Sequence, residues 1–332
     1  MSAAAAVAVM IIHAGSGGMG SFAAKMMHQF FAWGVCTFAV PWFFFASGYF
    51  FAGHLDEPGW WRRALATRLK SLAIPYLFWC GLFICLSTAL GALTDLYADR
   101  PILAGASTSR ILIDGFGLNL REHPSLVPFW YIRALAIIVC LAPPLMWALR
   151  RWRWGVPMAI LPLYVYCCGI NNCHAMPWFL FYSPFSLAGW IYFSIGALAR
   201  TKRPAIDLQR INTLALWAAA MTAICAGRLA QYWGRPEIAG VLWIAGIPPL
   251  LIGVWRLIPA TPWPAWLVAS AFPVYAIHYF IAHFLEKTFL PLAHPAWWAY
   301  PARAAIIVSA SFAIANLLRR FIPESRFIFG GR

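Results

Sequence analysis

The chain has 332 residues, of which 62% are hydrophobic and only 11% are charged. Soluble domains typically carry about 25% charged residues, and apolar stretches long enough to cross a bilayer recur along this sequence. The composition therefore excludes an ordinary soluble domain and predicts a polytopic membrane protein. The net charge of +15 would point to nucleic acid in a soluble protein, but in short loops between spans it indicates membrane topology.

The fold class that we predict is all-α, a polytopic transmembrane helical bundle formed by residues 1–332 as one membrane domain. A helix needs roughly 20 residues to cross the hydrocarbon core. The first apolar run is short, because it ends before Gly15. In chain order the expected spans, about ten in number, are 1–14, 29–52, 71–93, 128–149, 155–170, 179–199, 211–231, 237–255, 264–286 and 296–318.

The basic residues predict how these spans are oriented. With a cytoplasmic N-terminus, most of the 25 Lys and Arg residues fall in the loops and tail on the cytoplasmic side, as the positive-inside rule requires. We therefore expect both termini in the cytoplasm. The segment 53–70 is basic and aromatic, and we expect it to form a helix at the cytoplasmic interface. Its basic residues can share one side of that helix: Arg62, Arg63, Arg68 and Lys70.

Ionisable side chains inside membrane spans are costly, so each one is a candidate functional residue. His13 ends the first span, Arg133 lies one turn into the fourth, and His278 lies in the middle of the ninth. The predicted topology places all three in the outer half of the membrane, which favours a shared polar cavity. Each also has a structural interpretation: an interfacial histidine, an arginine that snorkels to the surface, and a satisfied core histidine.

The stretch VPWFFFASGYFF, residues 40–51, ends the second span close to the basic segment. One interpretation is a row of lipid-facing aromatic residues with a small-residue packing notch at Ser47 and Gly48. The other is that Ser47, Gly48 and Tyr49 line a passage through which a long, thin ligand passes between helices.

Four blocks of this sequence resemble the successive motifs of the bacterial acyltransferase type 3 family, and they follow an apolar run that ends in His13. Members of that family are integral-membrane enzymes that acylate hydroxyl groups, and sometimes amino groups, of surface sugars and other exported molecules. The blocks are FFFASGYFFAG at 43–53, RRALATRLKSLAIPYLFW at 62–79, PFWYIRALAIIVCLAPPL at 128–145 and PVYAIHYF at 273–280.

The resemblance implies ten core spans and a cytoplasmic acyl-CoA donor. His13 matches the family's essential histidine, whereas Ser2 stands where the family carries an arginine. A true start upstream of Met1 would explain that departure. The remaining matches are the basic pair Arg62 and Arg63, the middle-span pair Trp130 and Arg133, and the late pair Tyr275 and His278.

We therefore expect an integral-membrane acyltransferase of the bacterial cytoplasmic membrane. It would move an acyl group, acetyl or succinyl, from cytoplasmic acyl-CoA to a hydroxyl of a surface or exported carbohydrate. His13 would act as general base or as transient acyl carrier, while Arg133 or His278 would polarise the thioester carbonyl or orient the acceptor. The residues expected to bind the CoA donor are Arg62, Arg63, Arg68 and Lys70, which would grip its phosphates, together with Ser47, Gly48 and Tyr49.

The expected partners are acyl-CoA, a carbohydrate or lipid-linked acceptor, and membrane lipids. We expect no permanently bound cofactor, no metal and no nucleic acid. Two alternatives stay open. A multispan transporter or flippase of a sugar- or lipid-linked molecule would also suit the midplane His278 and the Gly- and Pro-rich residues 240–263. A catalytically inactive relative would suit the missing arginine at Ser2.

Overall fold

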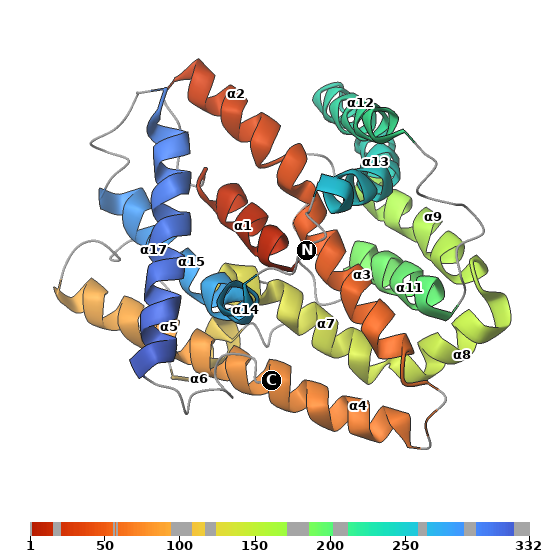
Figure 1. The fold of residues 1–332 in the computed structure, drawn as a ribbon, viewed down its shortest axis with the longest axis horizontal. Coiled ribbons are helices and arrows are strands. Elements are labelled where there is room, and N and C mark those ends of the chain that lie inside the picture. Colours follow the sequence, from red (N-terminus) through yellow and green to blue (C-terminus); the bar gives the residue numbers. More distant parts are fainter. Residues whose placement is uncertain are drawn as a thin grey trace. The chain divides into compact units, whose positions relative to one another are not determined.

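In a computed structural model of the chain (Figure 1), every secondary-structure element among the described residues is a helix. This confirms the all-α fold class. The residues that the structure describes are 2–15, 21–55, 57, 59–93, 108–116, 124–170, 186–201, 212–257, 264–288 and 297–321.

In chain order, the helices are α1 (Ser2–His13), α2 (Phe22–Phe31), η1 (Val35–Phe38), α3 (Ala39–Ala52), α4 (Trp60–Arg68), η2 (Leu69–Ala73), α5 (Ile74–Leu93), α6 (Thr108–Gly115), η4 (Val127–Phe129), α7 (Trp130–Cys140), α8 (Ala142–Trp152), α9 (Gly155–Ile170), α11 (Leu187–Thr201), α12 (Thr213–Tyr232), α13 (Pro236–Leu257), α14 (Ala265–Ala269), α15 (Ala271–Thr288) and α17 (Ala299–Phe321).

Among the described residues, 5 helical segments are long and apolar enough to cross a membrane, or up to 6 if a bent pair counts as one span. Several apolar helices of this length make the chain a multi-pass membrane protein. Each expected span contains a described helix, although residues 179–185 of the sixth lie outside the described part. The qualifying segments are Phe22–Ala52, Trp60–Ala89, Thr213–Tyr232, Pro236–Leu257, Ala299–Phe321 and the bent pair Val127–Cys140 with Ala142–Trp152.

The basic segment after the second span differs from the expected separate interfacial helix. From Trp60 the chain runs through α4, the π-helical η2 and α5 without a break, so the basic residues begin a helix that continues as the third span. Pro75, in the first turn of α5, lacks the N–H that would bond to the carbonyl of Ser71. A widened, π-type turn at this point accommodates that missing donor.

The fourth expected span, 128–149, is bent rather than straight. Its two halves, α7 and α8, meet at an angle of 68°. Pro143 and Pro144 occupy the first turn of α8, where neither can donate a backbone hydrogen bond to the preceding turn. The paired prolines therefore end α7 and redirect the chain.

The chain divides into two compact units. The first unit pairs α3 with α11 and α12 with α13, and α9 packs against α11 and α13 (Figure 1). The second unit pairs α15 with α17, with α2 against α17 and η4 against α15. Unit 1 comprises Met1–Ala5, Gly34–Ala66 and Ile137–Trp263, and unit 2 comprises Ala6–Trp33, Thr67–Ala136 and Pro264–Arg332.

Close approach of α3 and α11 depends on glycines in both helices. A Cβ atom added to Gly48 would lie 2.0 Å from the backbone oxygen of Phe193. One added to Gly196 would lie 2.0 Å from the backbone oxygen of Phe45. The backbones therefore touch directly, as small residues allow in membrane helices. In this structure Gly48 acts as the small-residue packing notch of the first interpretation, because α11 fills the space beside it.

Candidate functional site

Two of the three residues predicted to be catalytic lie next to each other in the second unit. His13 is the last residue of α1, and His278 lies in the middle of α15. Their ring centroids are 5.2 Å apart and their planes are inclined by 47°. Tyr279 meets the ring of His13 edge-on at 5.5 Å. A pair of imidazoles in contact concentrates proton-transfer groups at one place in a largely apolar protein.

His278 is fully buried, and its two ring nitrogens have different surroundings. Nδ1 lies 2.6 Å from the backbone oxygen of Tyr275. A carbonyl oxygen only accepts hydrogen bonds, so Nδ1 carries the proton and donates it. Nε2 is buried with no hydrogen-bond partner among the residues that the structure describes. The interpretation of His278 as a fully satisfied core histidine therefore accounts for only one of its nitrogens.

Tyr275, three residues before His278, is itself held in place. Its hydroxyl donates a hydrogen bond to the backbone oxygen of Pro128 in η4. Its ring stacks on Phe129 with centroids 5.8 Å apart and planes inclined by 10°. Pro128 and Phe129, at the start of the PFWYIR block, therefore hold Tyr275 in place, and the carbonyl of Tyr275 orients His278.

Neighbouring helices brace the end of α1 around His13. The hydroxyl of Tyr300 in α17 donates to the backbone oxygen of Ile11 at 3.2 Å. The ring of His28 in α2 lies 5.4 Å from that of Tyr300, and it covers Gly15, where an added Cβ would come within 2.1 Å of Nε2 of His28. Residues on both sides of His13 are therefore fixed by side chains from α2 and α17.

Arg303 is the functional candidate that the sequence analysis missed. It is only 1% exposed, and its Nη2 donates to the backbone oxygen of Ala282 in α15 at 2.8 Å. Its charge interacts with His13 and with Glu286, and Glu286 also lies 3.6 Å from Nδ1 of His283. The rule that singled out Arg133 also applies to Arg303, an arginine just inside the tenth expected span.

Arg133, the third predicted catalytic residue, lies on α7 in the same unit. The structure places its guanidinium near α5, where it interacts electrostatically with Tyr76 and Cys80. Tyr76 in turn donates a hydrogen bond of 2.6 Å to the backbone oxygen of Phe116. The charge of Arg303, in the same unit, acts on His13.

The predicted donor-binding residues near the end of α3 acquire a basic neighbour that the sequence analysis did not include. Arg200, in the last turn of α11, donates to the hydroxyl of Tyr49 at 3.3 Å, and its guanidinium carbon lies 5.2 Å from the centre of that ring. Arg200 also borders Gly53, where an added Cβ would lie 3.3 Å from its Nε. Tyr49 thus presents an aromatic face with a cation over it.

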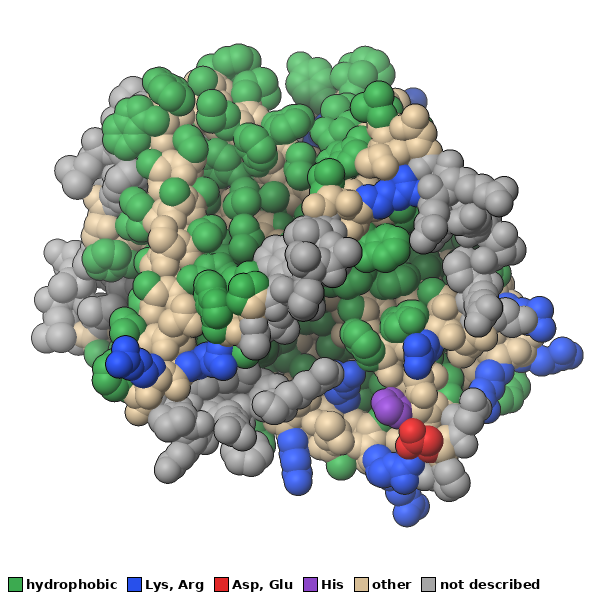
Figure 2. Space-filling view, viewed as in Figure 1, with side chains coloured by type: hydrophobic (Ala, Val, Ile, Leu, Met, Phe, Trp, Pro, Cys, Tyr) green, Lys and Arg blue, Asp and Glu red, His purple; other side chains and the backbone are tan. Residues whose placement is uncertain are grey.

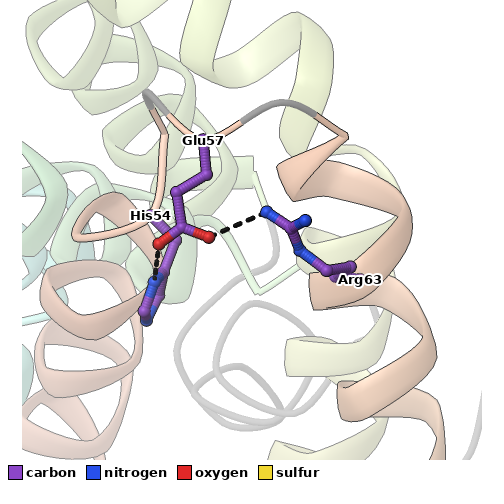
Figure 3. A network of polar contacts seen from close by, with 3 residues as sticks. All are labelled: His54, Glu57 and Arg63. Atoms are coloured by element: carbon purple, nitrogen blue, oxygen red, sulfur yellow. Dashed lines mark hydrogen bonds and ion pairs between the residues drawn. The ribbon is translucent and has the colours of Figure 1, made fainter.

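The turn before α4 carries an exposed polar network (Figure 3). Nδ1 of His54 donates to Glu57 at 2.9 Å, and Nη2 of Arg63 donates to the other carboxylate oxygen at 2.8 Å. The hydrogen bond from His54 lowers the pKa of the Glu57 carboxyl, and the charge of Arg63 lowers it further. Glu57 is therefore ionised at neutral pH, and the network weakens as the pH falls through that lowered pKa.

The predicted basic cluster does not lie on a single side of its helix. At about 100° per residue in an α-helix, Arg68 is turned about 120° away from Arg62 and lies still further from the side of Arg63. Lys and Arg side chains gather over the start of α4 and the end of α8 (Figure 2). Arg150 of α8 donates to the backbone oxygen of Leu55 at 3.3 Å, which adds a further cation to the turn between α3 and α4.

In the described part of the chain, no group of His, Cys, Asp and Glu residues has the arrangement that a metal ion needs. Apolar helices of membrane-spanning length accompany a pair of imidazoles, a buried guanidinium and a carboxylate. These features define a membrane protein equipped for proton or group transfer. The chain belongs to the acyltransferase 3 family: the family model, described as an acyltransferase domain, matches residues 3–320. That membership implies acyl-transfer activity. Comparisons with curated proteins and with solved structures find no match.

Proposed function

We propose that this protein transfers an acetyl or succinyl group from cytoplasmic acyl-CoA to a hydroxyl of a surface or exported carbohydrate. The observation that carries the proposal is the contact between His13 and His278, with ring centroids 5.2 Å apart. Acyl transfer to an alcohol needs a base for the hydroxyl proton and a positive group or donor for the developing oxyanion. The histidine pair supplies the first, and Arg303 or Arg133 supplies the second.

In this proposal the donor's phosphates are bound by the basic residues at the start of α4. Arg62 is exposed in α4, Lys70 is exposed in η2, Arg63 is held by Glu57, and Arg68 lies on another side of the helix. Guanidinium groups bind phosphates through charge-assisted and bidentate hydrogen bonds. Tyr49, with Arg200 over its ring, offers a stacking surface for the adenine.

The proposal includes ten spans with both termini in the cytoplasm of a bacterial cell, and insertion in the cytoplasmic membrane. The helices α1 and α9 are shorter than a full span, and in this proposal the segments next to them in the chain cover the rest of the bilayer thickness. This orientation puts the basic start of α4 on the side where acyl-CoA is made. Cysteine-accessibility labelling of single-cysteine variants at both termini would overturn it if either terminus reacted from outside intact cells.

We test the activity with the purified protein in lipid nanodiscs, supplied with acetyl-CoA or succinyl-CoA labelled in the acyl group and with a carbohydrate extract of the native envelope. We expect free CoA, measured by chromatography, together with label in the carbohydrate. His13→Ala should lower transfer by roughly 10³-fold, the order of loss expected when a group that stabilises the developing oxyanion is removed. Cys225→Ala, at an exposed position of α12, is the control and should be unchanged. Absence of free CoA with the unmodified protein would overturn the proposal.

Glu57→Gln gives a smaller prediction about the donor site. The change removes the charge that holds Arg63 at 2.8 Å and should free that guanidinium for phosphate. We expect the KM for acetyl-CoA to fall by about twofold to threefold, which corresponds to the modest value of one exposed ion pair. The unfolding temperature should not change, because all three partners are exposed. A KM that rises would show that the intact network itself binds the donor.

A further inference from the structure

The two histidines of the candidate site are not equivalent, and the difference begins with the tautomer of His278. Its Nδ1–H donates to the carbonyl of Tyr275 at 2.6 Å, with a second backbone contact to Val274. In a neutral ring with a proton on Nδ1, the other nitrogen carries a lone pair and no proton. Nε2 of His278 is therefore a proton acceptor in the structure as it stands.

Nothing in the described part of the chain uses that lone pair. Nε2 is buried and has no hydrogen-bond partner there, although a buried polar atom normally has one. Leaving such an atom unpaired costs about 1–3 kcal/mol. An acceptor of this kind next to His13, with ring centroids 5.2 Å apart, can receive the proton of a substrate hydroxyl.

The ring is also held at a fixed orientation, as a base must be to meet its substrate. The carbonyl of Tyr275 belongs to the same helix one turn earlier, so the imidazole is attached to α15 itself. The hydroxyl of Tyr275 is bonded to Pro128, and its ring stacks on Phe129. A base whose second nitrogen is oriented by an acceptor follows the logic of the histidine in hydrolase triads.

We propose that Nε2 of His278 is the general base of the reaction and that Tyr275 is its positioning residue. This inference rests on the proposed function. The O–H bond of the acceptor breaks and its proton passes to Nε2, while the oxygen forms a bond to the thioester carbonyl carbon. The C–S bond then breaks, and the CoA thiolate takes the proton from Nε2 and leaves as a thiol. His13, whose ring lies 5.2 Å from that of His278, donates a hydrogen bond to the thioester carbonyl oxygen as negative charge develops there, so attack by either nucleophile depends on it.

The test compares two acceptors that differ in their need for a base. Water needs deprotonation as it attacks the thioester, whereas hydroxylamine attacks through a neutral nitrogen lone pair. We measure hydrolysis of acetyl-CoA and formation of acetohydroxamate by the full-length protein in nanodiscs. His278→Ala should lose hydrolysis by about 100-fold or more and keep hydroxamate formation within about threefold. His13→Ala should lose both reactions.

The outcomes separate this inference from the proposed function. If the unmodified protein yields free CoA but His278→Ala loses both reactions equally, or if the selective loss appears in His13→Ala, His278 is not the base. If the unmodified protein yields no free CoA with water, hydroxylamine or carbohydrate, the proposed function fails and this inference fails with it.

A second measurement does not need activity. The ¹⁵N resonances of ring-labelled histidine report which nitrogen is protonated, and the His278 signals are identified by their loss in His278→Gln. We expect a protonated Nδ1 and an unprotonated Nε2. The opposite tautomer would overturn the inference even in a fully active protein.

Tyr275→Phe tests the positioning role and removes only the hydroxyl that binds Pro128. We expect kcat for hydrolysis to fall by about tenfold, the effect of a small misplacement of a base, with an unchanged KM for acetyl-CoA and unchanged hydroxamate formation. Tyr192→Phe is the matched control, because that buried tyrosine also donates to a backbone oxygen, that of Ile244 at 3.3 Å. Equal effects of the two changes on both reactions would reduce Tyr275 to a packing residue.

Discussion

Replacing Gly48 by alanine should lower the free energy of unfolding by about 3 kcal/mol, at the upper end of the usual cost of overpacking. The new methyl group would meet the backbone oxygen of Phe193 at 2.0 Å, and its carbonyl carbon at 2.8 Å. A carbonyl within a helix has no rotamer to change, so α3 and α11 would have to separate along their shared surface. Unfolding of the nanodisc or detergent-solubilised protein, followed by circular dichroism, measures the loss.

Two further glycines make the experiment specific. Gly196→Ala should be as harmful as Gly48→Ala, because its Cβ would lie 2.0 Å from the backbone oxygen of Phe45 on the facing helix. Gly81→Ala should be neutral or stabilising, since its nearest neighbour is Cζ of Phe116 at 3.7 Å and alanine favours helix by about 1 kcal/mol. Equal unfolding temperatures for Gly48→Ala and Gly81→Ala would show that α3 and α11 do not touch in this way.

This result also bears on how Gly48 should be tested as a donor-site residue. A bulky substitution there, such as Gly48→Trp, would separate α3 from α11 and abolish transfer through loss of the fold. Loss of activity in such a variant therefore says nothing about passage of the donor. Tyr49 and Arg200 are better positions, because they meet through their side chains, with 3.3 Å between the tyrosine hydroxyl and Nη1, rather than through the helix backbones.

Hydropathy was sufficient to predict an all-helical protein with several membrane-spanning helices, because the apolar stretches of a membrane protein follow from the thickness of the bilayer. It was not sufficient to predict how they join. The basic residues before Ser71 mark a change of composition, but the helix continues through the π-type turn η2, so α4, η2 and α5 form one helical segment. The proline pair Pro143 and Pro144 was a signal of the bend in the sequence. The expected span 128–149 was drawn as one straight helix without taking that pair into account.

The site was predicted in part for a similar reason. His13 and His278 are ionisable groups in apolar surroundings, and their expected common depth agrees with the contact of their rings. Arg303 is close to a loop in the sequence, where an arginine normally indicates topology. Only the packing of α17 on α15 shows that its guanidinium is buried against Ala282. Helix packing determines which arginine lies near a histidine. The spacing of residues along the chain does not predict it.

Arg303→Met should have the second large effect, on stability and on transfer together. Arg303 is only 1% exposed, and its loss leaves the backbone oxygen of Ala282 without the hydrogen bond from Nη2, which typically costs about 1–3 kcal/mol. Methionine also does not replace the positive charge that acts on Glu286, so we expect about 3 kcal/mol, the upper end of that range. Transfer should fall by at least about 100-fold, because the site loses a cation that interacts with His13.

Arg319→Met is the matched control for Arg303→Met on the same helix. Arg319 also donates to a backbone oxygen, that of Trp266 at 3.1 Å, but the bond is exposed, and its loss should change stability by no more than about 0.5 kcal/mol. Adding Glu286→Gln to Arg303→Met should restore part of the lost stability without restoring transfer, since the negative charge that Arg303 no longer balances is removed and the guanidinium is still missing. If the double variant is as unstable as the sum of the single changes, the charges of Glu286 and Arg303 contribute to stability independently.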